Sequence, residues 1–285
     1  MGTKGVIVGG RNDNHKEDDR ILTCLESMIE AFDEVWFCDW NSPKDKGPVL
    51  WNFKDKLPKT GKLHHVIISE ETSKYLTSSI PNISPYAFVL ASNLLIRRCT
   101  TDWIVSTTID IIMPKKEPLD DFISKANKNT FYTVSRRDAD YLELEKIGFN
   151  NWRKYRDELD SKSSPMYWPA KVTPNDNYSL VNCCGDFQLA HRDIWNKVKG
   201  FEEQMVYSCF NDTNIQKKAV LNGFNLEAEF DLPIYHLSHT GMGNDGSHPS
   251  KQNYNDPWDW VEWFEESQND DNWGFANIEI EHEII

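Results

Sequence analysis

The chain has 285 residues, with 31 Lys and Arg against 45 Asp and Glu, so its formal net charge is −14. This charge argues against a nucleic-acid-binding protein and against adhesion to an anionic membrane surface, because both partners attract basic residues. The mean hydropathy of −0.62, with no apolar run of about 18 residues, excludes a membrane-spanning helix.

Strand and helix patterns alternate over the first 115 residues. Short apolar runs that end in glycine or in turn residues predict buried strands. Longer segments with apolar side chains on one face predict helices, and Ser84-Pro85 is typical of a helix start. The predicted strands cover residues 5–8, 34–38, 65–69 and 103–106, and the predicted helices cover residues 17–34 and 84–99.

This order of elements predicts an α/β fold with a mostly parallel sheet and helices on its faces. In such sheets, ligands bind at the carboxyl ends of the strands. Three polar groups follow the predicted strands, namely Arg11-Asn12-Asp13, Asp39 and Asp110. We therefore expect them to meet at one edge of the sheet.

The second half of the chain has a weaker pattern. We interpret residues 150–180 as a long irregular loop because they are rich in serine and proline, and a tryptophan-rich helix is predicted from residue 256. No linker is evident, so a single domain is expected. The other predictions are helices over 119–126, 191–199 and 211–222, and strands over 131–135, 185–190 and 232–236.

Taken in order, these elements resemble the nucleotide-sugar glycosyltransferases of the GT-A fold, most closely family 2. That family has a polar turn after the first strand, an Asp ending the second, Asp-x-Asp after the fourth, and an acid opening a later helix. The resemblance implies a GT-A-like catalytic domain over 1–245. Residues 1–115 would bind the nucleotide-sugar, residues 116–245 would bind the acceptor, and residues 246–285 would form a tryptophan-rich acidic extension packed on the domain.

The resemblance implies a role for Asp39 in binding the base or ribose of the donor, since a carboxylate accepts hydrogen bonds from either. The alternative is an Asp that begins an Asx turn before Pro43. Other residues expected at the donor are Trp40, which would stack on the nucleotide, Arg11 and Arg136, which would contact phosphate, and Asn12 and Asp13, which would contact the base.

The metal-binding motif of the family is present only in part, as Thr108-Ile109-Asp110. The resemblance assigns Asp110 to Mn²⁺ or Mg²⁺, both of which prefer oxygen ligands. Thr108 would bind the ribose or a metal-bound water. Some members of the family have a histidine here, which implies that His239 is a further ligand for metal or diphosphate and that His236 is a weaker candidate. On spacing alone, two such histidines are more often structural.

Two acids are possible catalytic bases. The resemblance aligns Asp212 with the family's base, although Asn211 replaces the Glu that precedes it in the family. The alternative for Asp212 is a helix N-cap. Asp186 lies in the segment that lines the acceptor site in the family, and it is the second possible base.

The implied function is inverting, metal-assisted transfer of a sugar from a UDP- or GDP-linked donor to a hydroxyl of a glycan, a lipid-linked acceptor or a protein. One alternative is a catalytically degenerate carbohydrate-binding or scaffold protein of the same fold, favoured by Thr108 and Asn211. Another is a sugar nucleotidyltransferase, but Gly9-Gly10-Arg11 is only a fragment of its phosphate loop.

The six cysteines contain no CxxC motif and no metal-ligand spacing. Cys38 and Cys99 lie among apolar residues, which is typical of buried free thiols. Together with a first segment that lacks the apolar stretch of a signal peptide, this pattern favours a cytoplasmic location.

Overall fold

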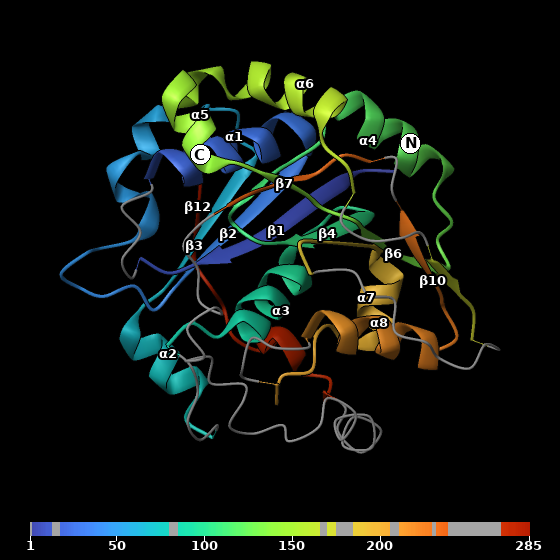
Figure 1. The fold of residues 1–285 in the computed structure, drawn as a ribbon. Coiled ribbons are helices and arrows are strands. Elements are labelled where there is room, and N and C mark those ends of the chain that lie inside the picture. Colours follow the sequence, from blue (N-terminus) through green and yellow to red (C-terminus); the bar gives the residue numbers. More distant parts are fainter. Residues whose placement is uncertain are drawn as a thin grey trace, which may run out of the picture.

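A computed structural model describes residues 2–12, 18–79, 85–165, 170–174, 185–205, 211–229, 232–238 and 269–285. Helices lie on both faces of a large twisted sheet (Figure 1). The predicted α/β class, with helices on both faces of a sheet that is parallel at its centre, is therefore confirmed. No helix in the described part of the chain is long and apolar enough to cross a membrane.

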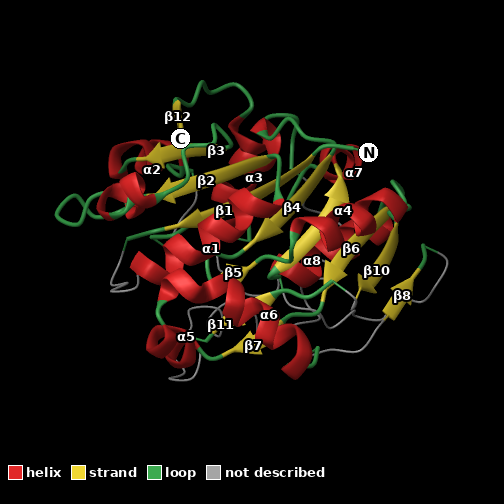
Figure 2. Ribbon diagram, turned by 90° about the horizontal axis from the view of Figure 1, so that it is seen from above, coloured by secondary structure: helices red, strands yellow, loops and turns green. Residues whose placement is uncertain are grey.

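Nine described strands form the large sheet, in the order β12-β3-β2-β1-β4-β9-β6-β10-β8 (Figure 2). Its centre, from β3 to β4, is parallel, whereas β9 runs antiparallel to both β4 and β6. The strands are β1 (Lys4–Gly10), β2 (Glu34–Trp40), β3 (Leu63–Ile68), β4 (Trp103–Thr107), β6 (Thr130–Val134), β8 (Ala170–Val172), β9 (Phe187–His191), β10 (Asn225–Glu229) and β12 (His282–Ile284).

Two apolar cores lie on opposite faces of this sheet. The first packs against α1, α4, α5 and α6, and the second against α3, α7 and α8 (Figure 1). The central strands are apolar on both sides because both faces are covered. The helices are α1 (Asp18–Ala31), α2 (Glu70–Leu76), α3 (Phe88–Arg98), α4 (Lys116–Lys125), α5 (Tyr141–Ile147), α6 (Trp152–Lys162), α7 (Arg192–Val198) and α8 (Asn211–Leu221), with short 3₁₀ turns at Val49–Asn52, Lys54–Lys56, Phe149–Asn151 and Trp273–Phe275.

A second sheet of three described strands, which we did not predict, lies beside the carboxyl end of β4. It consists of β5 (Ile111–Ile112), β11 (Tyr235–Leu237) and β7 (Arg137–Ala139), with β11 in the middle. β11 is antiparallel to β5 and parallel to β7. This sheet brings together three segments that are far apart in the sequence.

The prediction of an irregular loop over 150–180 is wrong for its first part, which forms α6. Trp152, Tyr155 and Leu159 recur at helical spacing and are all buried against the first core. The helix predicted from Ser84 begins instead at Phe88, and Ser84 itself lies outside the described residues, as does the segment predicted as a tryptophan-rich helix.

The last described segment, residues 269–285, lies against α3 and the edge of the large sheet. The guanidinium of Arg98 donates hydrogen bonds to the carbonyl oxygens of Gly274 (2.8 Å) and Ile278 (2.7 Å). β12 then pairs antiparallel with β3. This segment therefore supplies one edge strand of the large sheet, at the side opposite β8.

Candidate functional site

The carboxyl ends of β1 and β2 lie side by side in register, with Gly10 paired to Asp39. Just beyond them, the Arg11 guanidinium donates a hydrogen bond to the carbonyl oxygen of Asn41 (2.7 Å). Asn41 has a left-handed backbone (φ 58°), which asparagine tolerates better than most residues. Arg11 and Asn41 line a cavity of about 640 Å³, which is also lined by Glu70, Ser73, Lys74 and Thr77.

Asn12 anchors the loop that follows β2. Its backbone N–H donates to the Ser42 hydroxyl (2.8 Å), and its side-chain amide donates to the carbonyl oxygen of Gly47 (3.1 Å). The structure thus places Arg11 and Asn12 at the predicted edge, but with hydrogen bonds to their own chain. Asp13, predicted to contact the base, lies outside the described residues.

Asp39 is fully buried, and its carboxylate accepts the backbone N–H of Val49. Burial raises the pKa of Asp39, while hydrogen bonds from Ser42 and Val49 and the charge of Arg11 oppose the increase. Its Oδ1 atom has no hydrogen-bond partner among the residues that the structure describes. Asp39 therefore holds the loop after β2, and one of its buried oxygen atoms can still accept a hydrogen bond.

Trp40 was predicted to stack on the nucleotide, and the structure contradicts this prediction. Its side chain is 0% exposed within the second core, with the Phe275 ring at 6.5 Å between centroids. The strand alternation that turns Asp39 toward one face sends Trp40 to the other, where α3 and the C-terminal segment cover it. Trp40 is a core residue.

The carboxyl end of β4 and the small sheet form a second group of polar side chains. The Thr108 hydroxyl donates to Asp110 Oδ1 at 2.6 Å. Asp110 Oδ2 lies 3.4 Å from His236 Nε2, and both side chains are almost buried. Backbone pairing fixes this contact, because His236 pairs with Ile111 and the Leu237 N–H donates to the Asp110 carbonyl oxygen (2.9 Å).

Burial alone would lower the pKa of His236, but the adjacent Asp110 carboxylate outweighs it, and the pKa is raised. His236, the weaker of the two histidine predictions, is therefore the one found against Asp110. His239, predicted as a ligand for metal or diphosphate, lies outside the described residues.

Asp186 and Arg136 continue this group toward β9. Arg136 Nη1 donates to Asp186 Oδ2 at 2.8 Å, and the Thr108 hydroxyl lies 3.5 Å from Asp186 Oδ1. Arg136 also lies 3.3 Å from Asp138 Oδ1 through its Nε atom. The structure thus places Arg136 in ion pairs with two carboxylates, whereas phosphate contact was the prediction.

Asp212 is the second residue of α8, and its carboxylate accepts the backbone N–H of the next residue, Thr213 (2.8 Å). This contact is shorter in sequence than that of a usual N-cap, which reaches two or three residues ahead. A Cβ atom at Gly185 would lie 3.0 Å from Asp212 Cβ. The glycine therefore allows the segment that carries Asp186 to approach Asp212 closely.

Burial raises the pKa of Asp212, and the charge of Asp186 adds to the increase, although the Thr213 N–H opposes it. Two neighbouring carboxylates therefore differ in surroundings. Asp186 is paired with a guanidinium, whereas Asp212 is buried and, within the described part of the chain, contacts the backbone and hydroxyl of Thr213. A carboxylate with a raised pKa is suited to receive a proton near neutral pH.

Among the described residues, no three His, Cys, Asp or Glu side chains are arranged to hold a metal ion. Asp110 and His236 together offer one oxygen and one nitrogen ligand. Mg²⁺ and Mn²⁺ are commonly bound by one or two protein side chains, with phosphate and water completing the shell. The pair therefore fits a cation that arrives with a diphosphate, and its imidazole favours Mn²⁺.

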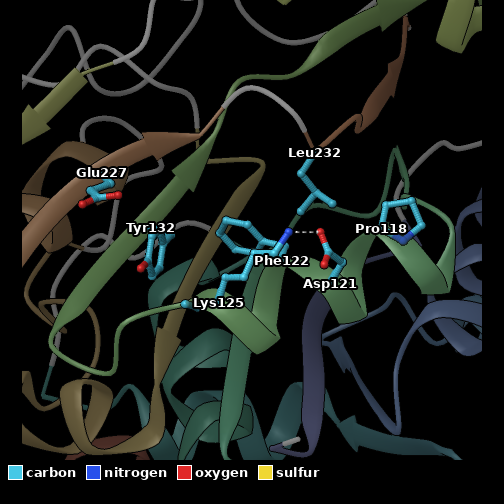
Figure 3. Close-up of a pocket in the computed structure, with 8 residues that line it drawn as sticks. Pro118, Asp121, Phe122, Lys125, Tyr132, Glu227 and Leu232 are labelled. Carbon is cyan, nitrogen blue, oxygen red and sulfur yellow. Dashed lines mark hydrogen bonds and ion pairs between the residues drawn. The ribbon is translucent and has the colours of Figure 1, made fainter.

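One further cavity, of about 320 Å³, lies between α4, β6 and β10 (Figure 3). Phe122 and Tyr132 line it, and its acids are paired, Asp121 with Lys125 and Glu227 with Lys171. None of the predicted site residues that the structure describes lines this cavity. This cavity is therefore separate from the two groups of polar side chains described above.

Asp138 was not among the residues predicted for the site, yet its Oδ1 atom lies 3.3 Å from both His236 and Arg136. Its neighbour Arg136 was found from its position after the fifth predicted strand. Asp138 had no comparable signal, because its partner in the small sheet is nearly one hundred positions away in the chain, as the pairing of His236 with Asp138 shows.

No protein-family model and no curated protein matches the chain. Among solved structures, it is similar to the mannosyltransferase PcManGT from Pyrobaculum calidifontis in complex with GDP-Man and Mn²⁺, with a TM-score of 0.53, 14% identity and coverage of 85% of this chain and 59% of that one. It is also similar to S. aureus TarS 1-349, with a TM-score of 0.50, 17% identity and coverage of 82% and 60%.

The chain thus spans about three fifths of the length of these two structures. At such low identity, the likeness concerns the fold. The chain has the fold of nucleotide-sugar glycosyltransferases, as the ordered elements of the sequence predicted.

Proposed function

We propose that this protein transfers a sugar from a nucleotide-sugar donor to an acceptor hydroxyl. The observation that carries the proposal is the group of side chains at the carboxyl end of β4. There, Asp110, Thr108, Asp186 and Arg136 are linked by contacts of 2.6–3.5 Å. Such polar convergence at strand ends is where α/β folds bind ligands.

The donor would lie along the edge from β1 to β4. Its nucleoside would occupy the cavity of about 640 Å³ beside Arg11 and Asn41. The buried Oδ1 atom of Asp39 would accept a hydrogen bond from the nucleoside after the loop that follows β2 moves. Asp110 and His236 would hold Mn²⁺ or Mg²⁺. When bound, the cation neutralises charge that develops on the leaving diphosphate.

We infer that Asp212 is the base, because its pKa is raised and Asp186 is already paired with Arg136. The acceptor oxygen forms a bond to the anomeric carbon as the bond from that carbon to the diphosphate oxygen breaks. The proton of the acceptor hydroxyl passes to the Asp212 carboxylate, and the nucleoside diphosphate leaves. One displacement of this kind inverts the anomeric configuration.

The test is an assay of the purified protein with UDP- and GDP-linked sugars, with and without Mn²⁺. A thermal-shift screen selects the donor, since a ligand stabilises the folded state according to its occupancy. Nucleotide release and the anomeric configuration of the product are then measured. Retention would rule out the single displacement, and no release from any stabilising donor would rule out transfer.

A non-catalytic carbohydrate-binding or scaffold protein is the second proposal, and one observation favours it. Thr108 stands where the family motif has an acid, and its hydroxyl is already bound to Asp110. A pure binding protein would show donor stabilisation without nucleotide release. A sugar nucleotidyltransferase would instead form or consume a nucleoside triphosphate, which the same assay detects.

We propose separate roles for three parts of the chain. Residues 1–115 would bind the donor, residues 116–245 would bind the acceptor, and residues 246–285 would form an extension packed on the domain. The acceptor would be a glycan, a lipid-linked saccharide or a protein. Cys24, Cys38 and Cys99 are free and buried, which favours a cytoplasmic enzyme.

A further inference from the structure

Asp138 is a carboxylate outside the predicted catalytic residues that contacts two of the side chains at the site. Its Oδ1 atom lies 3.3 Å from His236 Nδ1 and 3.3 Å from Arg136 Nε. About half of its side chain is exposed (51%). Surface carboxylates usually form one weak ion pair, so contacts with two nearly buried partners at one site need an explanation.

The small sheet determines where Asp138 lies. His236 on β11 pairs with Asp138 on β7 on one side and with Ile111 on β5, the neighbour of Asp110, on the other. Register partners on adjacent strands place their side chains on the same face. The backbone therefore holds the imidazole between two carboxylates, with Asp110 at Nε2 and Asp138 at Nδ1.

The contacts of Asp138 close a ring that joins the proposed cation ligands to the proposed acceptor side. Arg136 contacts Asp138 and also Asp186, and Thr108 lies within 3.5 Å of both Asp186 and Asp110. In order, the ring is Asp110, His236, Asp138, Arg136, Asp186 and Thr108.

A neutral imidazole carries one N–H, and two carboxylates here compete for it. If Nε2 carried the hydrogen, it would donate to Asp110, and Nε2 would then have no lone pair to offer a cation. If Nδ1 holds it, the N–H donates to Asp138 and the Nε2 lone pair faces Asp110. A carboxylate behind a histidine ligand fixes the tautomer in this way at many metal sites.

We propose that Asp138 is a positioning residue that keeps the hydrogen of His236 on Nδ1 and so presents the Nε2 lone pair, beside Asp110, to a divalent cation. The Asp138 carboxylate also pairs with Arg136 and so holds the Arg136 guanidinium against Asp186. The cation role rests on the proposed function, whereas the tautomer is a property of the protein without any ligand.

The experiment compares the full chain with Asp138→Ala, Asp138→Asn and the control Asp157→Ala. Asp157 is equally exposed (53%) and pairs with Lys115 on the protein surface, so its removal changes the net charge equally. Asp138→Val, which suits a strand, replaces the alanine variant if that variant is unstable. The tautomer of His236 is measured from imidazole ¹⁵N shifts at alkaline pH, with His236→Gln for assignment.

Wild type, Asp138→Asn and Asp157→Ala should carry the hydrogen on Nδ1, because an amide oxygen also accepts it. Asp138→Ala should carry it on Nε2. Titration with Mn²⁺, followed by the electron paramagnetic resonance of the free ion, should show affinity about 10–100-fold weaker in Asp138→Ala. Asp157→Ala should stay within about two-fold of wild type, as expected for an exposed pair.

An unchanged tautomer in Asp138→Ala and Asp138→Val would overturn the proposal, whether or not Mn²⁺ binds. The proposed function fails in a different way, through absence of nucleotide release by wild type. If the tautomer switches in Asp138→Ala while the wild type shows no transfer, the positioning role of Asp138 stands and only its catalytic use is ruled out.

Discussion

Two aspartates follow parallel strands on either side of β1, yet their surroundings differ. Asp39, at the end of β2, is 0% exposed and binds the backbone of its own loop. Asp110, after β4, keeps 13% of its side chain exposed and contacts Thr108 and His236. The comparison teaches that a strand-end carboxylate can serve either the fold or the site, depending on what the neighbouring segments supply.

The largest effect is expected at Asp110. Replacing Asp110 with alanine should lower kcat/KM for transfer by about 10³-fold or more, which is about 4 kcal/mol, because it removes the proposed cation ligand and the partner of His236. The measurement is the initial rate of nucleotide release at donor concentrations well below KM, which reports kcat/KM. Asp157→Ala is the control, and near-wild-type turnover in Asp110→Ala would place the cation elsewhere.

Asp212→Asn should lower kcat by about 10²–10³-fold, because the amide cannot receive the acceptor proton. Its melting temperature should equal or exceed that of wild type, since burial already disfavours the charged carboxylate, as its raised pKa indicates. Calorimetry and kinetics on the same sample test both parts. If Asp186→Asn has the larger effect on kcat and Asp212→Asn has little, the roles of the two acids are exchanged.

The stability of the fold should also depend on pH through His65, a buried side chain in the sheet that is not one of the two strand-end carboxylates. Burial lowers the pKa of His65 on β3 to about 4, with Glu283 raising it and Lys54 lowering it. Between about 6.5 and 4, the unfolded state therefore binds more protons, and stability should fall by at most about 3 kcal/mol as the pH decreases through that window.

Denaturant unfolding at several pH values measures this loss, and His65→Gln should remove it. A loss that persists undiminished in His65→Gln would instead assign the acid sensitivity to other groups. Below about pH 4 the contribution of His65 is constant, so any further loss there belongs to carboxylates.

Asp39→Ala should destabilise the fold by about 1–3 kcal/mol, because the buried N–H of Val49 loses its acceptor. Asp39→Asn, which keeps an acceptor oxygen, should cost less. Urea unfolding measures the stability, and the donor KM measures the proposed contact with the nucleoside. A stable Asp39→Ala variant with only a raised donor KM would show that Asp39 serves donor binding and not the stability of the fold.

Local patterns predicted most of the elements in the first 115 residues. The apolar runs at β1, β2 and β4, and the apolar face of α1, depend on burial within a few residues, so they are visible in the sequence. α6 was missed although Trp152, Tyr155 and Leu159 have helical spacing. The many charged residues and the following serines and prolines concealed that spacing.

The sequence by itself determined the α/β class, the parallel centre of the sheet, and the presence of Asp110 after a strand and of Asp212 at the start of a helix. Tertiary structure decided which of those side chains meet. Trp40 became core because α3 and residues 269–285 cover its face, and His236 met Asp110 and Asp138 because three distant segments pair in one small sheet. Periodicity reports burial along one element, whereas such pairing depends on contacts that no local pattern encodes.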